Sequence, residues 1–206
     1  MKMNDRKIEI LQYLQSRMKE YFYNSCQLLQ LDIEAHGNEI WSNLKYVIDE
    51  ILKGAQKEQW REQKGDIQYL VVSFLRISLH QDNIKFRIEV FDDGFYMDRK
   101  EISRNYFPSF LQKKYSEDLS RLYKDAGSKF VRLQGYELLW IKEQYTHYYE
   151  AIVYRMIENL SRLIMRNVEE SSISVTDDFK IIYGEFMDKA VILYTKEKDK
   201  DGVFSD

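Results

Sequence analysis

The stretch from Tyr136 to Val168 constrains the fold of this chain more than any other, because its pattern is typical of one long, uninterrupted helix. Its polar residues recur mostly at steps of three and four, which places them on one narrow line along a helix of period 3.6. The line comprises Glu143, His147, Glu150, Arg155, Glu158, Arg162, Arg166 and Glu169. At roughly 1.5 Å per residue, this helix is expected to be about 50 Å long.

The second half of this helix is apolar over most of its circumference. The apolar residues are Ala151, Ile152, Val153, Tyr154, Met156, Ile157, Leu160, Leu163, Ile164, Met165 and Val168. A surface helix carries a single apolar stripe, so this wider coverage requires neighbours on several sides. A second copy of the chain is one source of that cover, which predicts a homodimer.

The N-terminal region 1–64 is expected to be helical. Apolar residues at helical spacing define two segments: Ile8, Leu11, Leu14, Met18, Phe22, Cys26, Leu29 and Ile33, then Trp41, Leu44, Val47 or Ile48, and Ile51. Gly37 and Asn38 supply a left-handed stop and an N-cap between them, which predicts an antiparallel helical hairpin. The apolar phase also continues across Gly37, and glycine inside a helix costs only about 1 kcal/mol. One long helix over residues 8–55 is therefore the alternative.

The region 66–97 is expected to contain strand. Ile84, Phe86, Ile88 and Val90 alternate with charged residues, which predicts a half-buried strand that ends at the turn 92–94. Residues 66–81 fit a strand and a helix equally well, so periodicity does not decide between them.

Helices are expected over 99–169 and a β-hairpin over 172–196. A short helix at 99–105 precedes one that starts at Pro108 and ends before Gly127. Its inward residues are Leu111, Tyr115, Leu119, Leu122 and Ala126. After a short β-branched stretch at 173–175, strands at 179–186 and 189–195 join at Met187-Asp188, and this hairpin is expected to pair with the strand at Ile84. The charged residues 197–206 are expected to form a frayed tail.

These elements predict a single α+β domain over residues 1–206, because no linker composition divides the chain. The expected architecture is long amphipathic helices, with an N-terminal helical hairpin and one long central helix, packed on a small antiparallel sheet of three or four strands.

Composition limits the classes of protein to which the chain can belong. Hydrophobic residues make up 44% and the net charge is -3, so the chain can build a core and is not expected to be disordered. The polar N-terminus and the lack of a long apolar run predict a cytoplasmic protein without a membrane segment. Cys26 is the only cysteine, which excludes an intrachain disulfide and a multi-cysteine metal site.

Arg76 is the strongest candidate for a ligand-binding residue, because it interrupts an otherwise apolar stretch. A charged group that enters a core needs a partner. One hypothesis is that Arg76, with His80 or Arg87, binds an anionic small molecule at a pocket between sheet and helices. The alternative is a structural ion pair, or a head group that extends into water.

His147 lies one helical turn from Glu143 and from Glu150, which suggests metal binding or acid-base chemistry. It is on the polar line of its helix, however, and only His36 and His80 occur elsewhere, so no metal site is expected. No glycine-rich phosphate loop and no nucleophile motif occurs. We therefore expect no cofactor, and we favour a non-enzymatic protein.

The segment from Arg99 to Arg132 carries nine basic and four acidic residues, a local balance of 9 - 4 = +5, with aromatics interleaved. A surface that binds nucleic acid or another polyanion is one interpretation. An ordinary solvated helix face explains the same pattern, so nucleic acid is not the expected partner.

The leading functional hypothesis is a self-associating protein-interaction module. It follows from the wide apolar girth of 151–168 and from the 16 tyrosines, a residue type that is enriched at protein interfaces.

Overall fold

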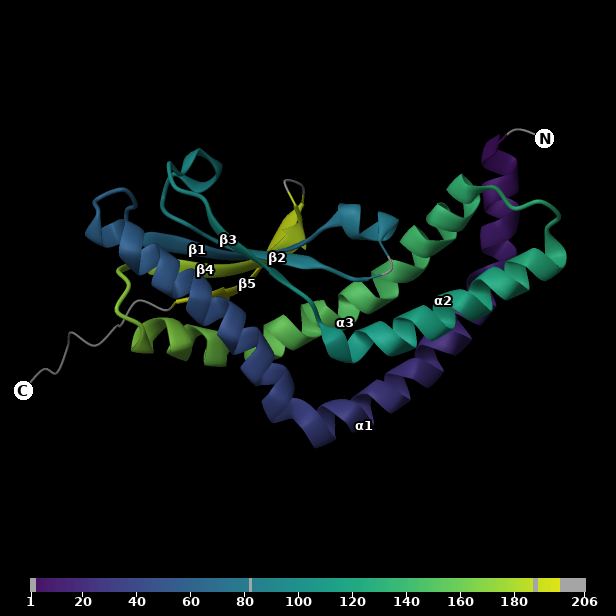
Figure 1. Cartoon of the computed structure of the whole chain (residues 1–206), viewed down its shortest axis with the longest axis horizontal. Coiled ribbons are helices and arrows are strands. Elements are labelled where there is room, and N and C mark those ends of the chain that lie inside the picture. The colour runs from purple at the N-terminus through teal and green to yellow at the C-terminus, as the bar shows by residue number, and fades with distance from the viewer. Residues whose placement is uncertain (1–2, 82, 187–188, 197–206) are drawn as a thin grey trace, which may run out of the picture. The chain divides into compact units, whose positions relative to one another are not determined.

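The computed structural model describes residues 3–81, 83–186 and 189–196 of the chain. Its elements in chain order are α1 (Met3–Trp60), β1 (Ile67–Phe74), the 3-10 helix η1 (Arg76–His80), β2 (Phe86–Phe91), the 3-10 helix η2 (Phe95–Met97), β3 (Ile102–Tyr106), α2 (Ser109–Lys129), α3 (Gly135–Glu170), β4 (Val175–Glu185) and β5 (Ala190–Thr195), as labelled in Figure 1. The expected α+β fold class is confirmed. The junction predicted at Met187-Asp188 and the tail predicted at 197–206 lie outside the described residues.

Contacts within the chain define two compact units, and each is assembled from three separate segments. Unit 1 comprises residues 1–41, 76–84 and 107–153, and unit 2 comprises residues 42–75, 85–106 and 154–206. Since α1 and α3 each contribute to both units, no linker along the chain separates them. The single domain over residues 1–206 stays a prediction.

The long central helix is confirmed as α3, which runs from Gly135 to Glu170. Glu137 stabilises its start, because its Oε2 accepts a hydrogen bond of 2.8 Å from the Gln134 backbone N–H, the geometry of a capping box. The chain itself buries much of the apolar second half. The buried residues there are Val153, Ile157, Ile164, Met165 and Val168.

The N-terminal helix α1 extends through the predicted stop at Gly37, but its backbone leaves helical geometry at His36 (φ -122°, ψ 19°). No glycine among the described residues has a positive φ, so Gly37 does not form the left-handed stop expected from the sequence. Helical segments therefore lie on both sides of a kink at His36. The antiparallel hairpin stays a prediction.

The sheet lies in unit 2 and has five described strands in the order β3-β2-β1-β4-β5, rather than the three or four expected. It is mixed and not antiparallel, because β4 pairs in parallel with β1. The C-terminal hairpin therefore does not pair with the strand at 86–91. The central position of β1 explains the ambiguity of its sequence: a strand covered on both faces reads as a continuous apolar run.

Two other segments differ from their predicted structures. Residues 66–81 are neither all strand nor all helix, because β1 ends at Phe74 and η1 begins at Arg76. The prediction of a helix at 99–105 is wrong, since β3 occupies 102–106 and pairs antiparallel with β2. Pairing with a neighbouring strand has overridden the local sequence preference there.

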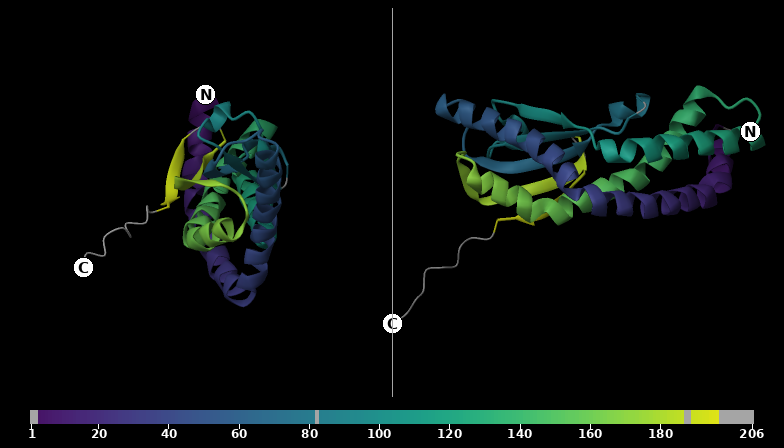
Figure 2. Two further views of the ribbon diagram at one scale, coloured as in Figure 1. Left: turned by 90° about the vertical axis from the view of Figure 1, so that its left-hand side faces the viewer. Right: turned by 60° about the horizontal axis from the view of Figure 1, so that its bottom comes forward.

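The C-terminal parts of α1 and α3 pack on one face of the sheet in unit 2 (Figures 1 and 2). A Cβ atom on Gly54 of α1 would lie 3.1 Å from Ile102 of β3. On α3, the ring of Tyr154 meets that of Tyr183 of β4 at a centroid distance of 5.4 Å. The opposite face carries a smaller apolar cluster of Val71, Phe91 and Ile182, with Tyr69 and Phe95 packed against it.

Unit 1 is built from the N-terminal parts of α1 and α3 together with α2. All five residues predicted to point inward from α2 are buried. Pro108 is the N-cap residue, but α2 continues to Lys129, so Gly127 lies inside the helix and not past its end. Tyr115, Tyr145 and Tyr149 are fully buried and are the largest side chains of this core.

Gly184 of β4 is where the fold depends most on the absence of a side chain. A Cβ atom there would lie 2.3 Å from the Lys189 carbonyl oxygen and 2.7 Å from Ala190 Cα. We expect Gly184→Ala to force β5 away from β4 and to lower the free energy of unfolding by roughly 1–3 kcal/mol, as overpacking does. Urea denaturation measures this loss.

Gly127→Ala is the matched control, because nothing lies within 4 Å of the added Cβ atom. It should leave stability unchanged or raise it by up to about 1 kcal/mol, since alanine is the better helix former. Equal stability of the two variants would show that β5 does not approach Gly184 as described.

Candidate functional site

The three residues predicted to bind a ligand are divided between the two units. Arg76 and His80 begin and end η1 in unit 1, and both are exposed. Arg76 therefore interrupts the apolar sequence without entering the core. Arg87 lies on β2 in unit 2, where it forms ion pairs with Glu89 (2.9 Å) and Glu101. Arg87 thus has the internal carboxylate partners of the structural alternative, and the ligand-binding role of all three residues stays a prediction.

Glu89 is the buried member of the Arg87 network, with only 3% of its surface exposed. Burial raises the pKa of Glu89, while the charge of Arg87 and its hydrogen bond act in the opposite direction. The guanidinium of Arg87 also lies 5.2 Å from the ring centre of Phe186. This network occupies the sheet face opposite to the helices, since Glu89 is the register partner of Val71.

A second buried carboxylate, Asp118 of α2, lies at the centre of unit 1 and is 2% exposed. Its Oδ2 atom accepts three hydrogen bonds, from Ser25 of α1 (2.8 Å) and from Tyr145 (2.6 Å) and Tyr149 (2.8 Å) of α3. One carboxylate oxygen therefore connects all three helices of the unit. Among the described residues, Asp118 forms no ion pair.

The two tyrosines remain hydrogen-bond donors to Asp118 over the whole physiological pH range. Burial, together with the nearby Asp118 carboxylate, raises the pKa of Tyr145 and of Tyr149 far above its usual value. Burial and Asp118 also raise the pKa of the neighbouring Cys26 thiol, which disfavours the reactive thiolate.

Asp118 is not among the site residues predicted from the sequence, where it counts only as one acidic charge of the segment 99–132, although the sequence carries a signal for it. Asp118 follows Tyr115 by three residues and precedes Leu122 by four, which places it on the inward face of α2. A carboxylate on the buried face of an amphipathic helix requires donors from the elements packed against it.

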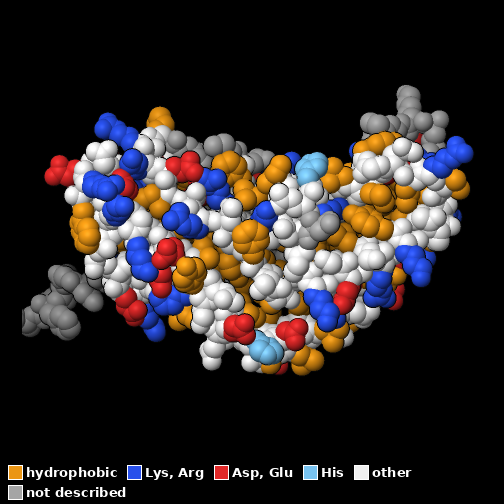
Figure 3. All heavy atoms as spheres, in the orientation of Figure 1, with side chains coloured by type: hydrophobic (Ala, Val, Ile, Leu, Met, Phe, Trp, Pro, Cys, Tyr) orange, Lys and Arg blue, Asp and Glu red, His pale blue; other side chains and the backbone are white. Residues whose placement is uncertain are grey.

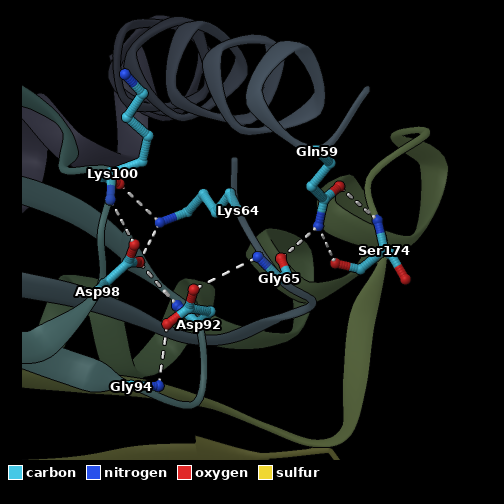
Figure 4. Close-up of polar contacts among 8 residues, drawn as sticks. All are labelled: Gln59, Lys64, Gly65, Asp92, Gly94, Asp98, Lys100 and Ser174. Carbon is cyan, nitrogen blue, oxygen red and sulfur yellow. Dashed lines mark hydrogen bonds and ion pairs between the residues drawn. The ribbon is translucent and has the colours of Figure 1, made fainter. Parts of the chain in front are cut away.

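In unit 2, Lys64 and Asp98 form an ion pair at the corner where α1 ends and the β2–β3 connection returns (Figure 4). Their side chains are 0% and 1% exposed. Lys64 also donates to the Lys100 carbonyl oxygen (2.9 Å), and Asp98 accepts from the backbone N–H groups of Asp92 (3.0 Å) and Lys100 (2.9 Å). The pair is thus embedded in a nearly complete set of hydrogen bonds.

Gln59 attaches the start of β4 to the same corner (Figure 4). Its amide nitrogen donates to the carbonyl oxygens of Gly65 and Ser174, both at 2.9 Å, and its Oε1 accepts from the Ser174 N–H at 3.0 Å. These contacts border a depression of about 510 Å³. Met97 lines it and is 86% exposed, so the corner presents a large apolar side chain on a loop with a fixed backbone.

The outer strand β5 is a candidate protein interface. It ends the described sheet, so its second edge has no partner strand among the described residues. Its sequence, AVILYT, contains no charge, and Val191 and Ile192 are each 55% exposed. Ile192 is the register partner of Ile182, which extends the apolar cluster on the sheet face opposite to the helices toward this edge.

The basic segment 99–132 does not form one continuous surface within either unit. Residues 99–106 belong to unit 2 and residues 107–132 to unit 1. Tyr106, Tyr115 and Phe130, three of its aromatic residues, are buried and so are not available for stacking on bases. Figure 3 shows positive and negative side chains interspersed on the visible face of the molecule.

The described residues contain neither a membrane-spanning helix nor a cluster of metal-ligating side chains. No helix among them is both long enough and apolar enough to span a membrane. No group of three or more His, Cys, Asp or Glu side chains among them is arranged to hold a metal ion. His147 is exposed and contacts Glu150 at 3.2 Å.

Comparison of the chain with protein-family models, with curated proteins and with solved structures returned no match.

Removing one partner of the buried Lys64–Asp98 pair should destabilise the folded protein. We expect Lys64→Met to lower the free energy of unfolding by about 3–5 kcal/mol, because it leaves the Asp98 carboxylate buried without a cation. Combining it with Asp98→Asn should recover part of that loss. Urea denaturation of the single and double variants measures the coupling.

Lys53→Met is the control for removing a lysine, because the Lys53 side chain is 72% exposed and its ion pair with Glu50 lies on the helix surface. We expect it to leave the free energy of unfolding nearly unchanged, because an exposed ion pair contributes little. An equal loss of stability in Lys53→Met and Lys64→Met would contradict the burial of the Lys64–Asp98 pair.

Glu137 should make the stability of the protein depend on acid pH. Burial raises the pKa of Glu137, but the Gln134 N–H and the Arg6 guanidinium at 2.6 Å together hold it below its usual value. The carboxylate therefore contributes stability that is complete above roughly pH 5 and is lost as pH falls through the lowered pKa. We expect Glu137→Gln to cost about 1.5–3 kcal/mol at neutral pH.

Denaturant titrations between pH 7 and pH 3 provide the measurement. The difference in free energy of unfolding between the two proteins should shrink below the usual glutamate pKa of about 4.3. A difference that stays constant down to pH 3 would mean that the ionised carboxylate has no preferential stabilisation in the folded protein.

Proposed function

We propose that this chain is a self-associating protein-interaction module, and that a second copy pairs with the open edge of β5. The observation that carries the proposal is the exposure of Val191 and Ile192 on an uncharged edge strand. An open edge presents unpaired N–H and C=O groups, and natural proteins usually protect such edges from association.

The two edges of the sheet differ in this respect. β3 at the other edge is only five residues long, exposes Arg104 and Asn105, and is followed by Pro108, which are features that discourage further pairing. β5 carries no charge and no proline within its span. Lys189 and Lys196 flank it without interrupting the apolar run.

A second copy suits this edge because a two-fold axis can place identical strands side by side. In such an isologous contact, each β5 offers the same backbone groups and the same apolar side chains to the other. Antiparallel pairing of this kind would continue the antiparallel β4–β5 ladder across the axis. The apolar side chains of both edges would then leave water, which favours association.

Self-association is tested by light scattering on the purified chain together with amide hydrogen exchange at two protein concentrations. A dimer at micromolar concentration, with amides of β5 that become more protected as concentration rises, supports the proposal. A chain that stays monomeric, or a dimer in which β5 protection does not change, contradicts it.

Ile192→Lys is the decisive variant, because a lysine at an edge strand disfavours pairing with another chain. We expect it to raise the dimer dissociation constant at least tenfold, a loss of about 1.4 kcal/mol. Sedimentation equilibrium measures this change.

Ile77→Lys is the matched control, since Ile77 is 62% exposed and lies in η1, outside the sheet. It should leave the dissociation constant unchanged. If Ile77→Lys weakens the dimer as much as Ile192→Lys does, the interface is not specific to β5.

A further inference from the structure

A depression in unit 1 brings a buried carboxylate and an exposed guanidinium together. It measures about 600 Å³ and lies between α1 and α2. Its lining includes Asn24 and Ser25 of α1, and Lys114, Glu117, Asp118 and Arg121 of α2. The volume is within the range of small-molecule sites, roughly 300–1,000 Å³.

The carboxylate of Asp118 has unused hydrogen-bonding capacity. Its three hydroxyl donors all bond to Oδ2, and Oδ1 accepts no hydrogen bond from the described residues. An ionised carboxylate has two oxygens with about four acceptor positions, and a buried one is stabilised by a charged donor. No cation of the described chain pairs with Asp118, so this position suits an ammonium group from outside.

The guanidinium of Arg121 is held in place but leaves its donors unused. Its central carbon lies 3.9 Å from the centre of the Tyr21 ring, and the hydroxyl of that tyrosine is anchored by a 2.6 Å hydrogen bond to Asp125. Stacking occupies the face of a guanidinium and leaves its N–H groups free in the plane. Within the described chain, Arg121 donates no hydrogen bond.

The spacing of the two groups limits the ligand. Asp118 and Arg121 are three residues apart on α2, so their Cβ atoms are separated by roughly 5–6 Å. The other charged pair of the lining, Lys114 and Glu117, neutralises itself at 3.1 Å. A ligand with an ammonium and a carboxylate group close together would satisfy both free groups without adding net charge.

We propose that this depression binds a small zwitterion of the α-amino-acid class, with its ammonium group on Asp118 and its carboxylate on Arg121. A planar guanidinium recognises a carboxylate through two parallel hydrogen bonds, and a point charge does not. The hydroxyls of Tyr145, Tyr149 and Ser25 fix the Asp118 carboxylate for the ammonium group. This site is independent of the self-association proposed for β5.

Calorimetric titration with three probes of equal carbon number tests the assignment: 2-aminopentanoate, pentanoate and pentylamine. The zwitterion should bind the full chain with a dissociation constant of about 1 mM or below, and each singly charged probe should bind at least tenfold more weakly. Equal binding by pentylamine or by pentanoate overturns the proposal, and so does the absence of binding by 2-aminopentanoate.

Arg121→Gln should weaken binding of 2-aminopentanoate at least tenfold and leave the helical content unchanged, because Arg121 is exposed. Lys124→Gln is the control, since it makes the same charge change on an exposed position one turn along α2. Asp118→Asn keeps an acceptor for the three hydroxyls and should also abolish binding. If that variant fails to fold, the comparison of Arg121→Gln with Lys124→Gln still decides, and equal affinities of those two refute the site.

Discussion

The need to compensate buried carboxylates is the constraint on which both units of this chain depend. Unit 1 encloses Asp118 and supplies hydroxyl donors from two other helices. Unit 2 encloses Asp98 and supplies the Lys64 ammonium group together with two backbone N–H groups. An ion deprived of water is tolerated only where such donors replace its hydration. These donors therefore connect the surrounding helices and loops to the two carboxylates.

The two solutions have different consequences for specificity. In unit 2 the charges of Lys64 and Asp98 neutralise each other. The corner that these two residues form with Gln59 therefore leaves no charge uncompensated and suits a structural support. In unit 1 no described cation forms an ion pair with Asp118, and its donors are tyrosine and serine hydroxyls, which do not cancel its charge. Internal neutralisation suits a structural element, whereas an uncompensated charge beside a depression suits recognition of a ligand.

The helices of this fold could be read from the sequence, and the sheet could be read only in part. The periodicity of 136–168 and of 111–126 reports burial of one face, which is a local property, and α3 and α2 agree with it. Strand order is set by pairing between distant segments, so neither the parallel contact of β1 with β4 nor the strand at 102–106 has a local signature. The periodicity of α2 places Asp118 on the inward face, but its hydroxyl donors come from the distant positions 25, 145 and 149, which no local pattern identifies.

Gly184 has a consequence for recognising distant relatives of this chain. Its hydrogen atom occupies space that the backbone of residues 189–190 denies to any other side chain. In a homologue that retains the same hairpin, glycine at this place should outlast the surrounding aliphatic residues, which can exchange with one another at little cost. That one invariant, followed about six residues later by an uncharged run, would serve as a marker of shared ancestry where overall similarity has faded.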